Sequence, residues 1–371
     1  MFFKIFKIFI INFFITIILF EILLNLYNPL GFRIKGNEII LENNIVRHLK
    51  VNNREIYHTK NSLGFRGPEL TNKDITKIIS VGGSTTENFF HDDKKTWTYL
   101  LSEKINKTYS SNFWFNNAGL DGHSTFGHII LIKDYISKIK PDVILFLIGA
   151  NDVWLDKEND YDSINIFNFN NLFKIGNQRS YYRNIINYLA IKSETASLIL
   201  NLYRYYIKTN QGHLYNLQNY ELIANQGNNE FKEYNFSQYI EERNILSERF
   251  IPQYNKRLER IIKLSKSNNF IPIFITQPTI LGSNAEKNLK NKKISKKDKS
   301  YLDLKSYNDA TRLIAKKHNI HLIDLSYHLE QNRLYYKDSI HFTESGINEV
   351  SNIIYEYFIK NCKTILKNCS F

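Results

Sequence analysis

Apolar and polar positions alternate along most of the chain in a way that predicts strands and helices in turn. Short apolar runs that end at glycine or polar residues are typical of buried strands. We expect such strands at Lys77–Val81, Phe113–Asn116, Val143–Ile148, Phe270–Thr276 and Leu322–Leu325. Apolar residues recur at helical spacing in Trp97–Ile105, Phe126–Ile139, Ser306–Lys317 and Glu344–Lys360. The run VILFLI is apolar throughout, which indicates burial on both faces of a parallel sheet.

This alternation predicts a three-layer α/β/α domain with a central, mostly parallel sheet over residues 77–371. Residues 156–243 break the pattern and are rich in Asn, Tyr and Phe, with helical spacing at Tyr181–Ala196 and Leu198–Lys208. A segment of this length is an insertion rather than a loop. Residues 31–76 are weakly patterned and are predicted to form a linker. That linker holds the turn-rich stretch NSLGFRGPE, in which the role of Arg66 is open.

The first 30 residues have the character of a membrane helix. Ile8–Tyr27 is mostly apolar, and about 20 such residues span a bilayer core. A cleaved signal peptide is the alternative, but no small-x-small cleavage site follows the apolar run. We therefore expect an uncleaved, single-pass anchor with the body of the protein outside the cytoplasm. Arg33 and Lys35 nearly balance Lys4 and Lys7, so charge leaves the orientation open. Glu21 interrupts the helix, and its carboxylate either snorkels or meets a partner.

Composition excludes some classes of protein. The chain has 371 residues, of which 43% are hydrophobic and 14% aromatic, which is not the profile of a disordered protein. The net charge of +13 comes from scattered lysines, and the densest run, Lys287–Lys299, is predicted to be a solvated loop. No zinc-finger spacing or RNA-binding aromatic motif occurs, so we expect no nucleic-acid partner. Cys362 and Cys369 provide no metal site, and they can pair only if the C-terminal tail is irregular.

Residues with catalytic potential follow the predicted strands. Ser84 comes after an apolar strand and two glycines, Gly122 after the second strand, and Asn151 after the third. Asp338 and His341 lie in the loop before the last predicted helix. Open α/β sheets bind ligands at the carboxyl ends of their strands. A serine nucleophile needs a base, and that base needs a third group to orient it, which His341 and Asp338 are placed to provide. The backbone N–H groups of Ser84 and Gly122 and the Asn151 amide are candidate oxyanion donors.

These four blocks, in this order, resemble the SGNH hydrolases, also called GDSL-type esterases. The resemblance covers about residues 77–359, and its most specific parts are GANDV and DSIHFTESG. It implies a flavodoxin-like sheet, Ser84 as nucleophile, Gly122 and Asn151 as oxyanion donors, and Asp338 with His341 as the C-terminal pair. The family's first block usually reads Gly-Asp-Ser, whereas this chain has glycine at position 83. The chemistry needs no cofactor, and no metal motif is present.

We therefore expect a membrane-anchored serine esterase that acts on acyl esters, such as O-acetyl groups, of a cell-envelope glycan or lipid. An O-acyltransferase that uses the same site is one alternative. A catalytically inactive glycan-binding or assembly protein on this fold is another, and it predicts an unreactive Ser84. Three histidines near the site in sequence, His91, His123 and His128, are expected to be structural.

Overall fold

The computed structural model describes residues 2–27, 34–35, 38–51, 54–71, 75–109, 113–155, 185–186, 188–206 and 233–366. The chain divides into two compact units, one of residues 1–40 and 158–220 and one of residues 41–157 and 221–371. Residues 41–71 thus belong to the unit that carries the sheet. The boundaries predicted from the sequence, at about residues 30, 76, 156 and 243, stay predictions.

The second unit is built on a five-stranded parallel sheet. Its strands are β5 (Thr76–Gly82), β6 (Phe113–Asn117), β7 (Val143–Ile148), β9 (Ile271–Thr276) and β11 (His321–Ile323). They lie in the order β6-β5-β7-β9-β11, and every neighbouring pair is parallel. In chain order this is 2-1-3-4-5, the doubly wound arrangement of flavodoxin-like folds. All five predicted strands are confirmed to within about two residues.

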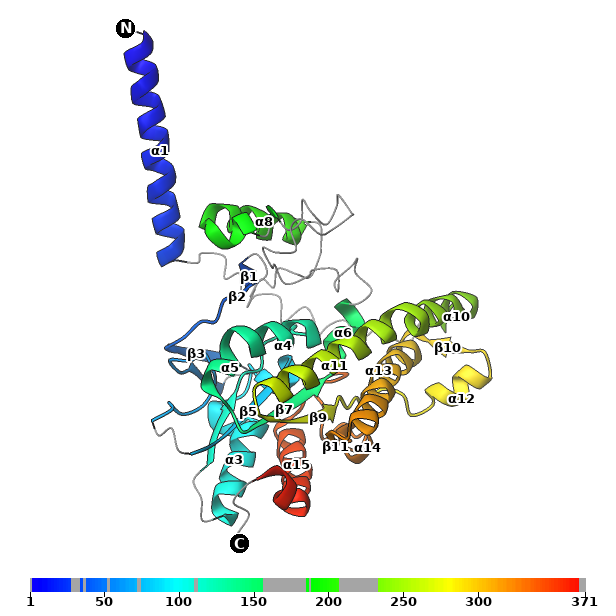
Figure 1. The fold of residues 1–371 in the computed structure, drawn as a ribbon. Helices are drawn as coiled ribbons and strands as arrows, with labels where there is room; N and C mark the ends of the chain where they lie inside the picture. The colour runs from blue at the N-terminus through cyan, green and yellow to red at the C-terminus, as the bar shows by residue number, and fades with distance from the viewer. Residues whose placement is uncertain are drawn as a thin grey trace. The chain divides into compact units, whose positions relative to one another are not determined.

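Helices cover both faces of this sheet (Figure 1). One face carries α3 (Trp97–Thr108) and α15 (Glu344–Ile365), whose buried side chains join the main apolar core with the strands. The other face carries α4 (Thr125–Leu131), α11 (Ile251–Ser267) and α13 (Lys296–His318). Helix α4 continues through a π-helical turn, Ile132–Ile136, into α5 (Ser137–Ile139). The predicted three-layer architecture is confirmed.

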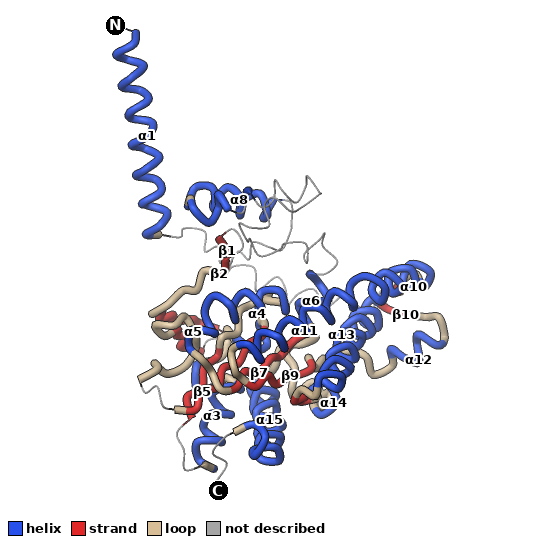
Figure 2. Tube along the Cα trace, in the orientation of Figure 1, coloured by secondary structure: helices blue, strands red, loops and turns tan. Residues whose placement is uncertain are grey.

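Smaller elements complete the unit (Figure 2). Strands β3 (Ile45–Val51) and β4 (Arg54–Lys60) form an antiparallel hairpin before the first sheet strand. A 3₁₀ turn, Asp93–Lys95, precedes α3. The remaining short elements are α2 (Ser84–Glu87), α6 (Ala150–Leu155), β8 (Glu233–Tyr234), α10 (Phe236–Ile245), a π-helical turn at Leu246–Phe250, α12 (Ala285–Lys290), β10 (Ile294–Ser295) and α14 (Leu325–His328).

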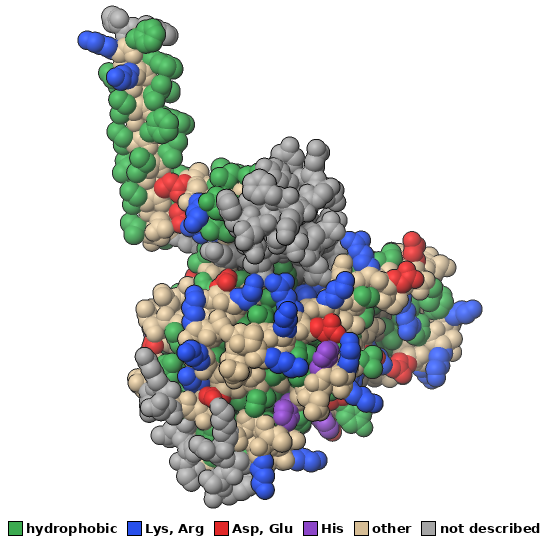
Figure 3. All heavy atoms as spheres, in the orientation of Figure 1, with side chains coloured by type: hydrophobic (Ala, Val, Ile, Leu, Met, Phe, Trp, Pro, Cys, Tyr) green, Lys and Arg blue, Asp and Glu red, His purple; other side chains and the backbone are tan. Residues whose placement is uncertain are grey.

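The prediction of a solvated loop at the Lys-rich run was wrong. That run contains most of α12, all of β10 and the first turn of α13. Helix α13 begins ten residues before the predicted helix start. Ser295 caps α13 by accepting from the Asp298 N–H, while the Asp298 carboxylate accepts from the Ser295 N–H. Ile294 and Leu302 pack in a small apolar cluster. Most lysines of this run lie at exposed positions of ordered elements, whereas Lys299 forms ion pairs with Glu242 and Asp303. Figure 3 shows Lys and Arg scattered over the visible face.

The first unit contains α1 (Phe2–Leu26), β1 (Ile34–Lys35), β2 (Glu38–Ile39) and α8 (Glu194–Tyr206). Apolar side chains cover most of the visible face of α1 (Figure 3). The helix is long and apolar enough to cross a membrane, a property that a signal sequence near the N-terminus shares. The Glu21 carboxylate accepts from the Ser193 hydroxyl at 2.6 Å and from the backbone N–H groups of Glu194 and Thr195 at 2.6 and 3.0 Å. Glu21 therefore has a partner, the N-terminus of α8.

Other predictions for this region fall partly outside the described residues. Residues 156–184 and 207–232 of the insertion lie outside them, as does Cys369. In the described part, the break between two helical stretches falls at Ser193 rather than near residue 197. Cys362 is buried in α15.

Candidate active site

The strand β5 delivers Ser84 to the carboxyl edge of the sheet through two glycines. A Cβ at Gly82 would lie 2.1 Å from the Thr86 hydroxyl and 2.8 Å from the Leu147 carbonyl oxygen. A Cβ at Gly83 would lie 2.2 Å from the Asn151 side-chain nitrogen. Gly82 therefore leaves no room for a side chain, because the turn packs directly against the end of β7, and a side chain at Gly83 would displace the Asn151 amide on α6. Ser84 follows as the first residue of α2 and is partly exposed.

Three side chains predicted from the sequence form a chain of hydrogen bonds. Ser84 Oγ lies 2.8 Å from His341 Nε2, and His341 Nδ1 lies 2.7 Å from Asp338 Oδ2. The second carboxylate oxygen of Asp338 accepts from the backbone N–H groups of Ile340 and His341, both at 2.9 Å. Partial burial alone would raise the pKa of Asp338, but the hydrogen bonds from the His341 ring and from these backbone groups lower that pKa to about 2. Asp338 is therefore ionised at neutral pH and fixes the orientation of the imidazole.

The two other predicted residues lie beside the serine turn. The loop after β6 is tied to β5 because the Leu120 N–H donates to the Gly82 carbonyl at 3.0 Å, and Gly122 then adopts a left-handed conformation with φ of 71°. Asn151 donates one amide hydrogen to the His123 carbonyl at 2.9 Å. An amide nitrogen carries a second hydrogen, so Asn151 retains one for a ligand. The structure thus brings all five predicted residues to one edge of the sheet.

Two buried ion pairs, which the sequence analysis missed, brace these loops. Arg257 on α11 donates to Asp152 at 3.2 Å and to the Thr125 hydroxyl at 2.7 Å, and Asp152 also accepts from Thr125. Lys60 lies 3.5 Å from the Glu87 carboxylate, whose other oxygen accepts from the Asp121 N–H at 2.7 Å. Buried charges are tolerated when they are paired in this way.

Gln277 was also missed. It follows β9 and is buried, and its side-chain oxygen accepts from the Thr85 hydroxyl at 2.9 Å. Asn308 on α13 holds the Gln277 backbone through two hydrogen bonds, at 2.9 and 3.1 Å. A polar residue directly after an apolar strand was a signal that could have found it, because Ser84 and Asn151 also come shortly after the ends of strands.

The three histidines that were expected to be structural are all buried. Burial lowers the pKa of His91 to about 4 and that of His128 to about 3, so both rings are neutral at neutral pH. His91 donates from Nε2 to the carbonyl of Phe342, the residue after His341, at 3.2 Å. No group of three His, Cys, Asp or Glu side chains in the described part of the chain is placed to bind a metal ion. The expectation that the protein uses no metal ion stays a prediction.

Residues of the segment that supports the His341 loop line two cavities. The Thr279 hydroxyl and the Ile280 N–H both donate to the Ser339 carbonyl, at 2.7 and 3.1 Å. One is a polar cavity of about 660 Å³ whose lining includes Ile280, Lys293 and Arg333. A second cavity, of about 260 Å³, includes Thr279 in its lining.

The sequence profile of the GDSL-like lipase/acylhydrolase family matches residues 80–347. A search of curated proteins finds no match. Among solved structures, the chain is similar to LAE5, an alpha/beta hydrolase enzyme from the metagenome of Lake Arreo, Spain, with 13% identity, a TM-score of 0.42 and coverage of 78% of this chain and 96% of LAE5.

Two further structures are similar to the chain. One is the acetyl xylan esterase AlAXEase, with 14% identity, a TM-score of 0.41 and coverage of 76% of this chain and 98% of the esterase. The other is a putative lipolytic protein of the G-D-S-L family from Desulfitobacterium hafniense DCB-2, with 11% identity and a TM-score of 0.40. The match to this second structure covers 76% of this chain and 99% of that one.

Proposed function

Because the chain belongs to the GDSL-like lipase/acylhydrolase family and is an ester-bond hydrolase, we propose that Ser84 is its nucleophile, His341 its general base and Asp338 the residue that orients His341. The observation that carries this proposal is the hydrogen-bond chain from Ser84 through His341 to Asp338, with separations of 2.8 and 2.7 Å. These separations lie within the range that proton transfer requires.

The reaction follows from this geometry. Ser84 Oγ attacks the ester carbonyl while His341 Nε2 takes the hydroxyl proton. The ionised Asp338 stabilises the imidazolium that forms, since its carboxylate accepts from Nδ1. His341 then returns the proton to the leaving alcohol, and an acyl group remains on Ser84. Water attacks this acyl-enzyme with His341 again as the base, which releases the acid and restores the serine.

Charge that develops on the carbonyl oxygen is stabilised by the backbone N–H groups of Ser84 and Gly122 and by the side-chain amide of Asn151. Ser84 begins α2 and Asn151 lies in the first turn of α6, so two of the three donors belong to helix starts that follow strands. Such donors are aimed before substrate arrives, which is why removing one typically costs about 10² to 10³ in kcat.

The substrate class rests on the N-terminal helix. We assign α1 as a single membrane anchor with the catalytic unit on the extracytoplasmic side, and an acyl ester of a cell-envelope glycan or lipid, O-acetyl among them, as the substrate. A reporter fused to the C-terminus and assayed on both sides of the membrane tests the orientation. Reporter activity in the cytoplasm would contradict it.

The experiment that tests the catalytic assignment is hydrolysis of p-nitrophenyl acetate by the full chain in detergent, beside Ser84→Ala and His341→Ala. We expect turnover by the wild type and its loss in both variants. Turnover that survives Ser84→Ala would refute the assignment. A folded wild-type protein that releases no p-nitrophenol would favour the non-catalytic alternative. Release that depends on an added sugar, with the acylated sugar as product, would show acyl transfer to a sugar hydroxyl.

A further inference from the structure

Arg66 lies between the loop that follows α2 and the end of β6, the two segments that neighbour Ser84 and Gly122 in the chain. We propose that Arg66 and His91 are positioning residues of this site: Arg66 fixes the loop that follows α2, and His91 on that loop fixes the backbone beside His341. This inference rests on the roles proposed above for Ser84 and His341, and it assigns a function to the NSLGFRGPE stretch, which the sequence left unexplained.

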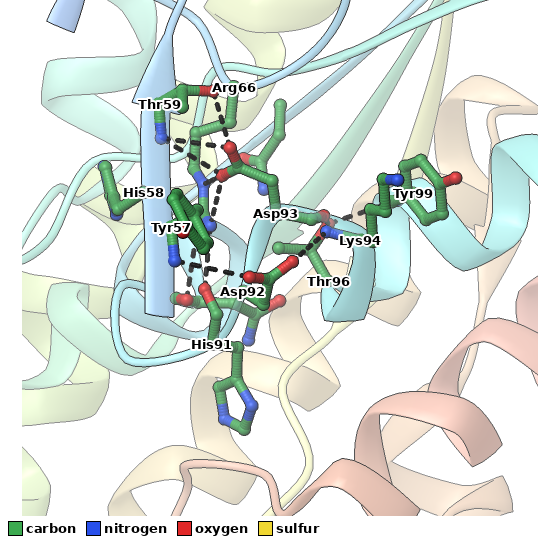
Figure 4. Close-up of polar contacts among 12 residues, drawn as sticks. Tyr57, His58, Thr59, Arg66, His91, Asp92, Asp93, Lys94, Thr96 and Tyr99 are labelled. Carbon is green, nitrogen blue, oxygen red and sulfur yellow. Dashed lines mark hydrogen bonds and ion pairs between the residues drawn. The ribbon is translucent and has the colours of Figure 1, made fainter. Parts of the chain in front are cut away.

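The Arg66 side chain is buried, and all five of its N–H donors are used (Figure 4). Nη1 donates to the carbonyls of Glu87 and Asn88 at 2.6 and 2.8 Å. Nη2 donates to the His91 carbonyl at 2.8 Å and to Asp93 at 2.6 Å, and Nε donates to Asp93 at 2.9 Å. One side chain therefore binds three backbone carbonyls within the eight residues that follow the nucleophile. Lysine has three donors on a flexible stem and cannot reproduce this fork.

The Arg66 backbone and the Asp93 carboxylate are themselves held by further hydrogen bonds. The backbone of Arg66 pairs with Asn117 at the end of β6, with both N–H···O distances at 2.9 Å, and the loop that carries Gly122 starts there. Asp93 accepts from the backbone N–H of Thr59 on β4 at 3.0 Å and from its hydroxyl at 2.5 Å, as Figure 4 shows. Arg66 thus connects the β3–β4 hairpin, the loop after β6 that carries Gly122, and the loop after α2.

His91 extends the arrangement to the catalytic base. Its backbone is bound by Arg66, and its ring nitrogen Nε2 donates to the carbonyl of Phe342 at 3.2 Å. Phe342 directly follows His341, so this hydrogen bond restrains the Phe342–Thr343 peptide unit, one unit beyond the peptide groups that flank the His341 Cα. His91 as a whole is only 7% exposed, so solvent is a poor substitute for that acceptor. A shift of about 1 Å at a reacting group can cost 10²-fold in rate.

The experiment uses the full chain in detergent and compares His91→Leu, which removes the donor, with His91→Gln, which keeps an N–H donor. His48→Leu, the same change at an exposed histidine on β3, is the matched control. The measurements are kcat and KM for p-nitrophenyl acetate and the hydrogen exchange of backbone amides 338–343. We expect His91→Leu to lower kcat by about 10- to 100-fold with KM within about twofold, and to speed exchange in this loop. His91→Gln should retain most of both properties.

Arg66→Met extends the test, since it should speed exchange in residues 87–93 as well as in residues 338–343. Equal kcat and equal exchange in His91→Leu and His48→Leu would overturn the proposal, as would a loss in His91→Gln as large as in His91→Leu. If the wild type hydrolyses no ester, the proposed function fails, and the exchange measurements still decide whether His91 restrains the loop. The two failures are therefore distinguishable.

Discussion

Gly83 is the position where one added carbon tests the oxyanion site most sharply. A Cβ there would lie 2.2 Å from the Asn151 side-chain nitrogen, whereas real Cβ contacts stay above 3.0 Å. Gly83→Ala therefore forces the Asn151 amide to retreat by at least about 0.8 Å. The backbone of Gly83 itself is not strained by a methyl group, because its φ is −89°.

The magnitude follows from what Asn151 loses. Its hydrogen bond to the His123 carbonyl, at 2.9 Å, breaks or lengthens, which costs about 1 kcal/mol of stability. The displaced amide no longer reaches the oxyanion, and loss of one such donor costs about 10² to 10³ in kcat. We therefore expect Gly83→Ala to lower kcat by about 10²-fold while the thermal unfolding midpoint changes by only a few degrees.

A double-mutant cycle isolates the cause. Asn151→Ala removes the amide that clashes, so Gly83→Ala should cost little more in that background. The assay is steady-state hydrolysis of p-nitrophenyl acetate by the wild type, both single variants and the double variant. Wild-type kcat in Gly83→Ala would refute the reasoning, and so would a double variant whose loss is the product of the two single losses.

Three further predictions concern the groups around the site. Asp338→Asn should lower kcat by about 10⁴-fold, because the amide favours the wrong tautomer of His341, and a kcat within tenfold of wild type would contradict its orienting role. Arg257→Met should lower the free energy of unfolding by about 3–5 kcal/mol in urea titrations, because it leaves buried Asp152 unpaired, whereas Arg249→Met at an exposed position should change it by under about 0.5 kcal/mol. The free energy of unfolding should fall as the pH drops from about 6.5 towards 4. Three buried histidines have lowered pKa values and stay neutral in the folded state over this range, whereas in the unfolded state they bind protons. These histidines are His58, His91 and His128. Urea titrations at pH 7.5 and pH 5 check this, and equal stabilities at the two values would argue against it.

Much of the sheet and the candidate site could be predicted from the sequence because both rest on local signals. Apolar runs such as VILFLI identify strands, and the catalytic side chains directly follow those strands or precede α15. The arginines that hold the loops of the site, Arg66 and Arg257, gave no such local signal. Arg66 and Arg257 act through partners that lie 21 to 27 and 105 to 132 positions away in the chain, so only the fold identifies their roles. The Lys-rich run was mispredicted because its charge masked the capping box at Ser295 and the buried positions beside it.

The most direct test of the account is labelling of the full chain with a fluorophosphonate probe, followed by mass spectrometry to locate the modified residue. The probe reacts with serines that an adjacent base activates. The account predicts one modification, on Ser84, that disappears in Ser84→Ala and falls sharply in His341→Ala. Modification of another serine, or no modification of a folded wild-type protein, would contradict the claim that Ser84 is the activated nucleophile.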